Sequence, residues 1–442
     1  MTLLELTPTH THDNRLADLP VAIIGAGPVG LAAAANLVER GIDFRIYEAG
    51  DSIADSVQQW GHVRLFSPWK LTVDPASRRL LEKTEWQHPD ERALPTGFEL
   101  VEQYLVPLAA LEPIASRLRT GVEVVAVSRE GMDRTRTAGR ESAPFVLRLR
   151  SGGSIVEKTA RAVIDASGTY RTPNSLASSG LDPLGLDEVA DLVSHALPDV
   201  LGRERARFAG RHTTVVGAGH SAANTLLALA ELAEGEPGTR TTWIIRSASA
   251  ARMTNSADDE LAARASLGAR VAALVESGAI EEIDRFEIVG LAREGASARL
   301  LGHRAGMLVE HHTDLIVNAT GFRPDLNPLR EVRLDLDEIV EAPSRLAPLI
   351  DPNVHTCGTV EPHGFVELQH PEHGFFLAGM KSYGRAPTFL LATGYEQVRS
   401  IAAWLAGDLA AASAVQLSLP ATGVCSTSID GGATPAESGC CA

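Results

Sequence analysis

Residues 21–48 read VAIIGAGPVGLAAAANLVERGIDFRIYE, and this stretch decides how the chain folds. The apolar run 21–24 is typical of a buried parallel strand, and the Ala-rich run 31–40 is typical of a helix. A second strand is expected at 44–48. The order of strand, glycine turn, helix and strand predicts an α/β unit of the kind that binds dinucleotides.

The glycine turn fits the pattern G-x-G-x-x-G. Gly25 would form the tight turn, Gly27 would let the backbone approach a pyrophosphate, and Gly30 would let the helix pack closely on the strand. The helix N-terminus would stabilise the phosphate charge. Glu48 ends the second strand, where a carboxylate can bind ribose hydroxyls. The alternative is that these glycines serve only a tight turn between strand and helix.

The same unit occurs a second time, beginning with the apolar strand 213–216. Here Ala222 takes the third glycine position, an allowed variant, and the second strand, 241–246, ends in Arg246 rather than an acid. An arginine there suits the 2′-phosphate of NADPH, although it could equally be a solvated strand end. The residues expected to bind this second dinucleotide are Gly217, Gly219, Ser221 and Arg246.

Composition and charge exclude several classes of protein. The 442 residues include 44% hydrophobic residues, and 40 Lys and Arg against 56 Asp and Glu leave a net charge of −16. This acidic balance argues against nucleic-acid binding and against attraction to anionic membranes. Residues 21–38 are apolar enough to imitate a membrane helix, but their glycines and proline exclude one. With no signal-peptide pattern at 1–18 and only four cysteines, we expect a cytoplasmic protein.

Two further segments carry a family resemblance. Residues 165–168 read DASG and residues 318–324 read NATGFRP, and both resemble link segments of the two-dinucleotide-binding-domain flavoproteins. The resemblance covers roughly residues 20–405 and implies an α/β fold with two Rossmann-like three-layer domains, FAD in the first and NADPH in the inserted second. It also implies cofactor contacts from Gly168, Thr320 and Gly321. The expected boundaries are a flexible leader at 1–19, an FAD domain at 20–172 and 313–415, an NADPH domain at 173–312, and a flexible tail at 416–442.

Within that superfamily the chain is most similar to the flavin-containing monooxygenases of class B. Residues 60–69, WGHVRLFSPW, resemble the segment that lines the flavin ring, which implies a cofactor contact from Trp60. His62 and Arg385 are the candidate catalytic residues, although a hydrogen-bonded structural histidine is the simpler interpretation of His62. The sequence departs from the family because its fingerprint before the second glycine motif is scattered, and because Met380 follows Gly379 where an Asp is usual.

Residues 381–389, KSYGRAPTF, and the cysteine-bearing tail resemble flavoproteins encoded with bacterial arsenic-resistance genes. This resemblance implies a soft metalloid or organoarsenical substrate. Thiolates select soft metals, so Cys425, Cys440 and Cys441 are candidate ligands of trivalent arsenic or antimony. Cys357 is either a fourth soft ligand or a small buried hydrophobe. The alternative for the tail is that its cysteines have no role.

The expected function is NADPH- and FAD-dependent monooxygenation with O2 and a small-molecule or metalloid substrate. Because the flavin carries the chemistry, no Ser–His or paired-carboxylate arrangement is required. One alternative is a reductase that passes electrons through the tail thiols to a metal ion or disulfide. No cysteine precedes Cys357, so a flavin-proximal thiol pair is missing for that route. Another is a flavin-bound, metalloid-binding protein without turnover.

Overall fold

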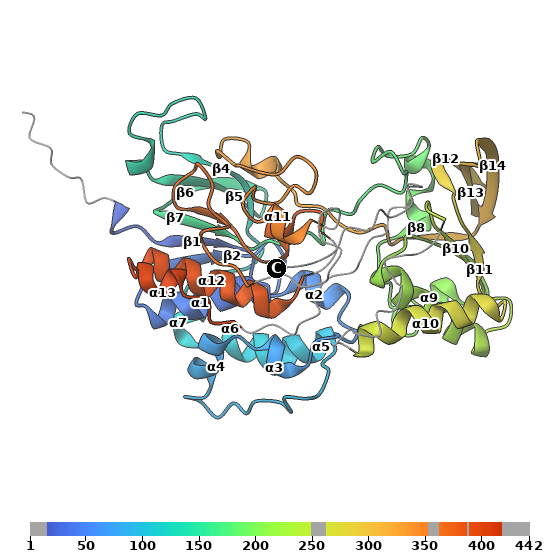
Figure 1. Ribbon diagram of the computed structural model, residues 1–442, viewed down its shortest axis with the longest axis horizontal. Coiled ribbons are helices and arrows are strands. Elements are labelled where there is room, and N and C mark those ends of the chain that lie inside the picture. The colour runs from blue at the N-terminus through green and yellow to red at the C-terminus, as the bar shows by residue number, and fades with distance from the viewer. Residues whose placement is uncertain (1–15, 249–261, 352–361, 387–388, 418–442) are drawn as a thin grey trace, which may run out of the picture.

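A computed structural model describes residues 16–248, 262–351, 362–386 and 389–417, which form two lobes (Figure 1). Each lobe is built on a five-stranded parallel sheet. The first sheet has the order β16 (Phe375–Leu377), β7 (Ala162–Asp165), β1 (Val21–Ile24), β2 (Phe44–Tyr47) and β3 (Leu118–Arg119). The second has the order β11 (Glu281–Ile283), β10 (Arg240–Ile244), β9 (His212–Val216), β15 (Leu315–Asn318) and β8 (Val193–Ser194). The predicted α/β class with two Rossmann-like units is confirmed.

The first lobe has three layers because both faces of its central strand are buried. Val21 and Ile23 face the helices, whereas Ala22 and Ile24 face the opposite side. On the helical side, α1 (Pro28–Glu39) packs against α12 (Leu391–Leu405), and a run of four fully buried alanines lets the two helices approach closely. The shorter helices of this lobe are α2 (Asp55–Gln59), α3 (Trp69–Thr72), α4 (Pro75–Leu81), α5 (Gly97–Leu100), α6 (Val106–Ala109), α7 (Glu112–Ala115), α11 (Ala347–Ile350) and α13 (Leu409–Ser413).

An antiparallel meander covers the other face of the first sheet. It consists of β4 (Glu123–Arg129), β5 (Phe145–Ser151) and β6 (Ser154–Ala160). Phe145 and Leu147 of β5 are fully buried and pack in one cluster with Ile24 of β1. The next strand, β7, leaves the meander and joins the parallel sheet beside β1.

In the second lobe, α9 (His220–Gly235) and α10 (Ala262–Glu276) lie together, as the lower right of Figure 1 shows. A second antiparallel sheet, β12 (Glu287–Glu294), β13 (Ser297–Arg304) and β14 (Met307–Thr313), belongs to the same lobe. The remaining short elements are α8 (Arg205–Phe208) and 3-10 helical segments at Arg140–Ser142, Leu186–Leu192, Asn327–Leu329 and Gly379–Tyr383, with a π-helical turn at Val101–Leu105. Among the described helices, none is long and apolar enough to cross a membrane.

The expected boundary at residue 313 needs correction. β15 pairs in parallel with β9, with Leu315 opposite Thr213, so this strand belongs to the second sheet. The chain therefore returns to the first lobe only after Asn318. Its return segment runs antiparallel to the outgoing one: the Asn174 N–H donates to the Gly321 carbonyl at 2.9 Å, and the Arg323 N–H donates to the Thr172 carbonyl at 3.0 Å.

Two buried polar clusters lie within the first lobe. Glu372 accepts hydrogen bonds from Arg129 Nε at 2.8 Å and from Arg140 Nη2 at 2.7 Å, and all three side chains are at most 5% exposed. The second cluster surrounds Asp74, the N-cap of α4, whose carboxylate accepts from the Ser77 N–H at 2.7 Å. Complete burial raises the pKa of Asp74 to about 6.

Candidate flavin and nicotinamide site

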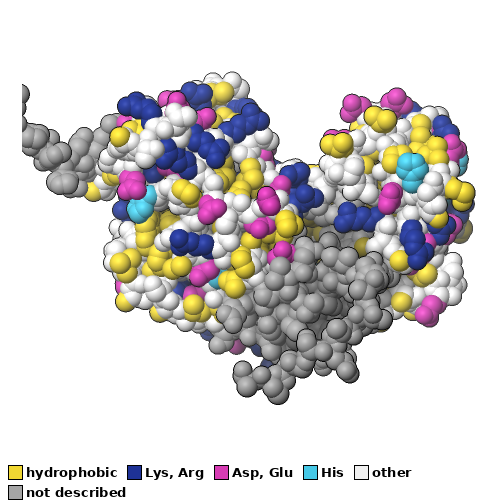
Figure 2. Space-filling view, turned by 45° about the horizontal axis from the view of Figure 1, so that its top comes forward, with side chains coloured by type: hydrophobic (Ala, Val, Ile, Leu, Met, Phe, Trp, Pro, Cys, Tyr) yellow, Lys and Arg dark blue, Asp and Glu magenta, His cyan; other side chains and the backbone are white. Residues whose placement is uncertain are grey.

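A cavity of about 680 Å³ opens at the carboxyl ends of the strands of the first sheet. It reaches the second lobe, because His220, Ser221 and Asn224 at the start of α9 are among its lining residues. Figure 2 shows the two lobes as separate masses with a notch between them. The carboxyl edge of a parallel sheet is where α/β folds bind their ligands, and the volume is within the usual range for such sites, about 300–1,000 Å³.

The first glycine turn forms one wall of this cavity. Gly25 adopts φ +94°, and a Cβ there would lie 2.9 Å from the Ala166 carbonyl oxygen, so no other residue fits without strain. A Cβ on Gly30 would lie 2.0 Å from the Gly25 carbonyl oxygen, which shows how closely α1 packs on the turn. A Cβ on Gly27 would meet nothing within 4 Å, and Gly27 lines the cavity. The space in front of Gly27 is therefore available to a ligand.

Glu48 stands beside that turn at the end of β2, and its side chain lines the cavity. Its two carboxylate oxygens accept hydrogen bonds from the Ala26 N–H at 2.7 Å and the Gly50 N–H at 2.8 Å. These bonds hold the carboxylate beside the glycine turn, in the position expected for binding a ribose. Of the other predicted flavin contacts, Trp60 and Gly168 also line the cavity.

The second glycine turn repeats the backbone geometry of the first. Gly217 has φ +135°, and a Cβ there would lie 2.1 Å from the Ala319 carbonyl oxygen. A Cβ on Gly219 would meet nothing within 4 Å. Ser221 lines the cavity that the first lobe also forms, whereas Arg246 is exposed just beyond β10. The turn and Arg246 thus lie at the carboxyl edge of the second sheet, as the sequence pattern predicted.

Thr320 and Gly321 do not line the cavity and lie instead where the chain crosses between the lobes. The Thr320 hydroxyl lies 2.7 Å from Asn318 Oδ1 and 3.1 Å from the Asn174 carbonyl oxygen. Gly321 has φ +99°, which favours glycine at the crossing. Their structural neighbours are the second glycine turn and the outgoing segment, so they tie the two crossing segments together.

The two candidate catalytic residues are not brought to the cavity. His62 is half-buried against residues 198–204 of the second lobe, and burial lowers the pKa of its imidazole. Arg385 has an exposed side chain, and its backbone N–H donates to the Val340 carbonyl. Neither residue is among those that line the cavity, and their catalytic role stays a prediction.

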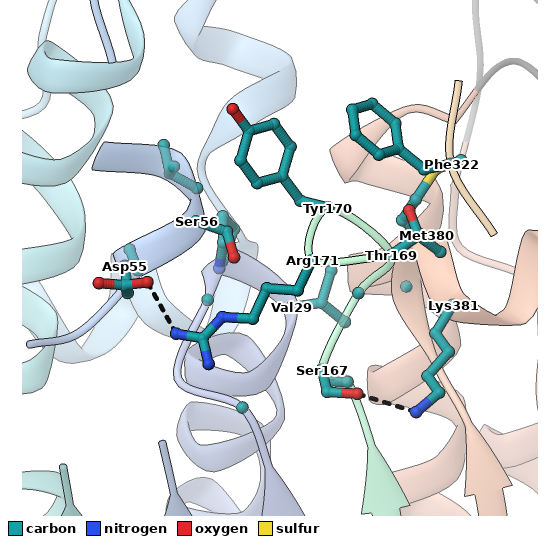
Figure 3. Close-up of a pocket in the computed structure, with 18 of the residues that line it drawn as sticks. Val29, Asp55, Ser56, Ser167, Thr169, Tyr170, Arg171, Phe322, Met380 and Lys381 are labelled. Atoms are coloured by element: carbon teal, nitrogen blue, oxygen red, sulfur yellow. Dashed lines mark hydrogen bonds and ion pairs between the residues drawn. The ribbon is translucent and has the colours of Figure 1, made fainter. Parts of the chain in front are cut away.

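A buried ion pair in the cavity wall was missed by the sequence analysis. Lys381 Nζ lies 2.7 Å from Asp165 Oδ2 and 3.0 Å from Ser167 Oγ, and Figure 3 shows the contact with Ser167. Both charged side chains are almost fully buried, at 4% and 2% exposure. Asp165 ends β7, and Lys381 follows the turn after β16. The signal in the sequence was a lysine close after Gly379, where the related flavoproteins carry an acid.

Aromatic side chains meet where the lobes join. Tyr170 and Phe322, which come from the outgoing and returning segments, lie 5.1 Å apart between ring centroids and both line the cavity. His195 of the second lobe lies 4.4 Å from Tyr170. Burial raises the pKa of Tyr170 to about 12, so its phenol stays protonated at neutral pH. Across the cavity, Phe66 of the first lobe lies 5.4 Å from His220 of the second.

The cysteines Cys357, Cys425, Cys440 and Cys441 lie outside the described residues. Within the described ranges, no group of three or more His, Cys, Asp or Glu side chains could hold a metal ion. The predicted thiolate site for arsenic or antimony therefore stays a prediction.

The fold and the cavity define a two-lobed dinucleotide oxidoreductase. The chain belongs to the pyridine nucleotide-disulphide oxidoreductase family, whose model matches residues 22–352. This membership confirms the predicted enzyme class, an oxidoreductase, and FAD and NADPH are the cofactors expected of it. The two glycine turns, the open space at Gly27 and the carboxylate of Glu48 fit such cofactors.

The chain is similar to individual monooxygenases and reductases. The chain is 28% identical over 200 residues to the indole-3-pyruvate monooxygenase YUCCA1 of Oryza sativa, an alignment that spans 45% of this chain and 42% of that protein. The bacillithiol disulfide reductase Bdr of Bacillus cereus has a similar fold, with a TM-score of 0.65 at 19% identity over 88% of this chain and 99% of that chain.

A flavin-containing monooxygenase from Stenotrophomonas maltophilia matches with a TM-score of 0.58 at 21% identity, over 88% of this chain and 98% of that chain. The cadaverine monooxygenase DfoA of Erwinia amylovora matches with a TM-score of 0.62 at 15% identity, over 91% and 98%. At these identities the solved structures show a shared fold, which monooxygenases and reductases both use.

Proposed function

We propose that this protein is an NADPH- and FAD-dependent monooxygenase of soft nucleophilic substrates, such as trivalent arsenic, organoarsenical or antimony species, in metalloid resistance. The observation that carries the proposal is the cavity, whose lining among the described residues comes from both glycine-turn regions and includes no cysteine. A reductase of disulfides needs a thiol relay beside its flavin, and the described wall offers none. O2 is then the electron acceptor that best fits this wall.

Bound FAD would supply the hydride-accepting and oxygen-activating chemistry. The first glycine turn and Glu48 would bind its pyrophosphate and ribose, and Trp60 would line its ring. The N-terminus of α9 would receive the pyrophosphate of NADPH. Arg246 would bind the 2′-phosphate that distinguishes NADPH from NADH.

Water must be kept from the reacting centre, because its entry would uncouple the consumption of NADPH from oxidation of the substrate. The cavity wall is largely apolar near the lobe junction, where Phe66, Phe322 and Leu197 line it. Phe66 and His220 lie against each other here, so side chains of both lobes contribute to this part of the wall. These side chains would exclude water while the substrate is bound.

For arsenite the proposed reaction balances as one As(OH)3, one NADPH, one proton and one O2 giving one AsO(OH)3, one NADP+ and one water. Arsenic is oxidised from the trivalent to the pentavalent state and gains one oxygen atom from O2. The other oxygen atom leaves as water, with the electron pair from NADPH. The tail thiols would bind the trivalent substrate before the reaction.

A reductase is the second candidate, because the fold is shared with bacillithiol disulfide reductase. Electrons would then pass from NADPH to a tail disulfide of Cys440 and Cys441 and on to a metal ion or a disulfide. A third candidate is a flavin-bound protein that binds the metalloid through Cys425, Cys440 and Cys441 without turnover.

One experiment separates the three. Purified holoenzyme is mixed with NADPH without air, the flavin absorbance is followed, and O2 is then added with and without arsenite. The monooxygenase predicts bleaching, and equal amounts of NADPH, O2 and arsenate in the complete reaction. Activity that needs no O2 and is lost in a Cys440→Ser, Cys441→Ser variant would instead establish the reductase. A flavin that NADPH never bleaches would establish binding without turnover.

A further inference from the structure

Lys381 is the most deeply buried cation in the cavity wall. The wall contains three cationic side chains, Arg64, Arg171 and Lys381. The first two are 60% and 50% exposed, whereas Lys381 is 4% exposed. A charge of this kind is costly to bury unless it is paired, so its partners decide what it can do.

Asp165 is the ion-pair partner of Lys381, and Ser167 forms hydrogen bonds with both side chains. Asp165 Oδ2 faces the ammonium, while Asp165 Oδ1 accepts from the Ser167 hydroxyl at 2.6 Å and from the Ser167 N–H at 3.1 Å. An ammonium has three donors, and among the described residues two contacts, to Asp165 and Ser167, are made. A donor therefore remains for a ligand in the cavity.

The backbone that carries Lys381 is fixed by Gln397 of α12. Gln397 Oε1 accepts from the Gly379 N–H at 2.8 Å, and Gln397 Nε2 donates to Ser382 Oγ at 2.9 Å. The Ser382 hydroxyl in turn donates to the Gly379 carbonyl at 2.8 Å. Gln397 and Ser382 are fully buried, so the turn after β16 presents its lysine from a rigid support.

The strand order places this ammonium next to the glycine turn. Ile24 of β1 is in register with Asp165 of β7, and a Cβ on Gly25 would lie 3.0 Å from the Ser167 Cα. The wall thus runs from Glu48 at β2, past the glycine turn at β1, to Lys381 at β7 and β16. A dinucleotide with its adenosine ribose at Glu48 would bring its pyrophosphate to the turn and its flavin half past Lys381.

The pyrophosphate needs positive charge that the turn itself lacks. The turn sequence from Gly25 to Gly30 contains no Lys or Arg. A helix N-terminus supplies about half an elementary charge, against the two charges of a pyrophosphate. We propose that Lys381 supplies the missing counter-charge to the pyrophosphate of FAD, with Asp165 as the positioning residue that orients its ammonium. This inference rests on FAD occupying the cavity.

The test compares three probes on the apoprotein. The dissociation constants of FAD, ADP and riboflavin are measured by calorimetry for the wild type and for Lys381→Met. FAD and ADP contain the pyrophosphate, and riboflavin does not. A charged hydrogen bond contributes about 1.5–3 kcal/mol, so we expect FAD and ADP to bind about 10- to 100-fold more weakly and riboflavin to change less than about 3-fold. Arg45→Met, which removes a cation from β2 outside the cavity wall, should leave all three unchanged.

A second variant separates charge from structure. Lys381→Met alone leaves the buried Asp165 without its partner and can lower the stability of the apoprotein. The double variant Lys381→Met, Asp165→Asn removes both charges, and its thermal stability should return towards that of the wild type while ADP binding stays weak. Wild-type ADP affinity in the double variant, or equal weakening of all three probes, would overturn the proposal. A wild type that binds FAD but never turns over contradicts the proposed function and leaves this inference intact.

Discussion

The two lobes carry the same glycine turn in different surroundings. In both, the first glycine lies against a carbonyl of the neighbouring strand end, Ala166 for Gly25 and Ala319 for Gly217. They differ at the third position, where Gly30 has no room for a Cβ and the second lobe buries Ala222 completely. They differ also in charge, because the first unit ends in buried Glu48 and the second in exposed Arg246. The two sites therefore share one backbone conformation, and the side chains around it determine which ligand each site can bind.

Glu372 and its arginines in the first lobe are deeply buried, whereas Glu310 and Arg299 in the second are partly exposed. This difference predicts the largest change in the free energy of unfolding. Glu372→Gln would leave Arg129 and Arg140 buried without a counter-charge, so we expect a loss of about 3–5 kcal/mol in the free energy of unfolding. The matched change in the second lobe is Glu310→Gln, whose partner Arg299 is partly exposed, and it should cost at most about 1 kcal/mol. Urea unfolding measures both. Similar losses in the two variants would remove this distinction.

The third glycine position of each turn, Gly30 in the first lobe and Ala222 in the second, predicts the next largest change in stability. Gly30→Ala would place a Cβ 2.0 Å from a backbone oxygen, so α1 must shift, at a cost of about 3 kcal/mol and with loss of FAD retention. Ala222→Gly in the second lobe should cost only about 1 kcal/mol, the propensity difference within a helix. Thermal unfolding and the flavin content of the purified variants give the comparison. A Gly30→Ala variant that retains FAD and full stability would contradict the close packing.

Two titratable groups, Asp74 in the first lobe and His311 in the second, should respond to acid in opposite directions. In the first lobe, burial raises the pKa of Asp74 from 3.8 to about 6, so its contribution favours the folded state below about 4 and is lost as pH rises to about 6. The size is on the order of 2–3 kcal/mol. In the second lobe, burial lowers the pKa of His311 from 6.5 to about 4, so its contribution is present above 6.5 and is lost as pH falls to about 4.

Amide exchange measured lobe by lobe at pH 5, 6 and 7 checks this. Acidification should weaken protection around β9 and β14, where His311 Nε2 lies 2.8 Å from the Thr214 hydroxyl, and strengthen it around α4. His311→Gln should flatten the response around β9 and β14 alone, and Asp74→Asn that around α4 alone. A single response shared by both lobes would show that these two groups do not govern it.

Arg246 gives the smallest effect on stability and a selective effect on binding. Arg246→Ala removes an exposed side chain, so unfolding should change by less than about 0.5 kcal/mol. If Arg246 binds the 2′-phosphate, KM for NADPH should rise about 10-fold or more while KM for NADH stays within about 2-fold. Steady-state assays with both nucleotides measure this. An unchanged ratio would assign Arg246 to a solvated strand end.

The sequence was sufficient for features that depend on neighbours along the chain. Gly25 and Gly217 were recognisable because a positive φ between a strand and a helix favours glycine, whatever the rest of the fold does. The sheet to which β15 belongs could not be recognised in this way. Its run 315–318 suits either parallel sheet, and only its pairing with β9 shows that it lies in the second. A non-local pairing of this kind leaves no local pattern.

The same limit applies to the site. Lys381 was noticed as part of a motif, but its burial depends on Asp165, which lies far away in the sequence and comes from a different strand. His62 was placed at the flavin because it belongs to the segment 60–69, yet its ring lies near residues 198–204, whereas Trp60 of the same segment lines the cavity. Proximity in sequence predicted the segment correctly but not the direction of each side chain.

The crossing between the lobes has a mechanical consequence. Outgoing residues 172–174 and returning residues 321–323 form an antiparallel pair of segments joined by two backbone hydrogen bonds. The Asn318 side-chain amide also donates to the Asn174 carbonyl at 2.9 Å. A single connecting segment would let the second lobe rotate in any direction. Two hydrogen-bonded segments side by side resist bending in their common plane and allow twisting most readily. Twisting about the long axis of these segments is therefore the relative motion of the two lobes that the connection resists least, because bending would stretch the hydrogen bonds that join them.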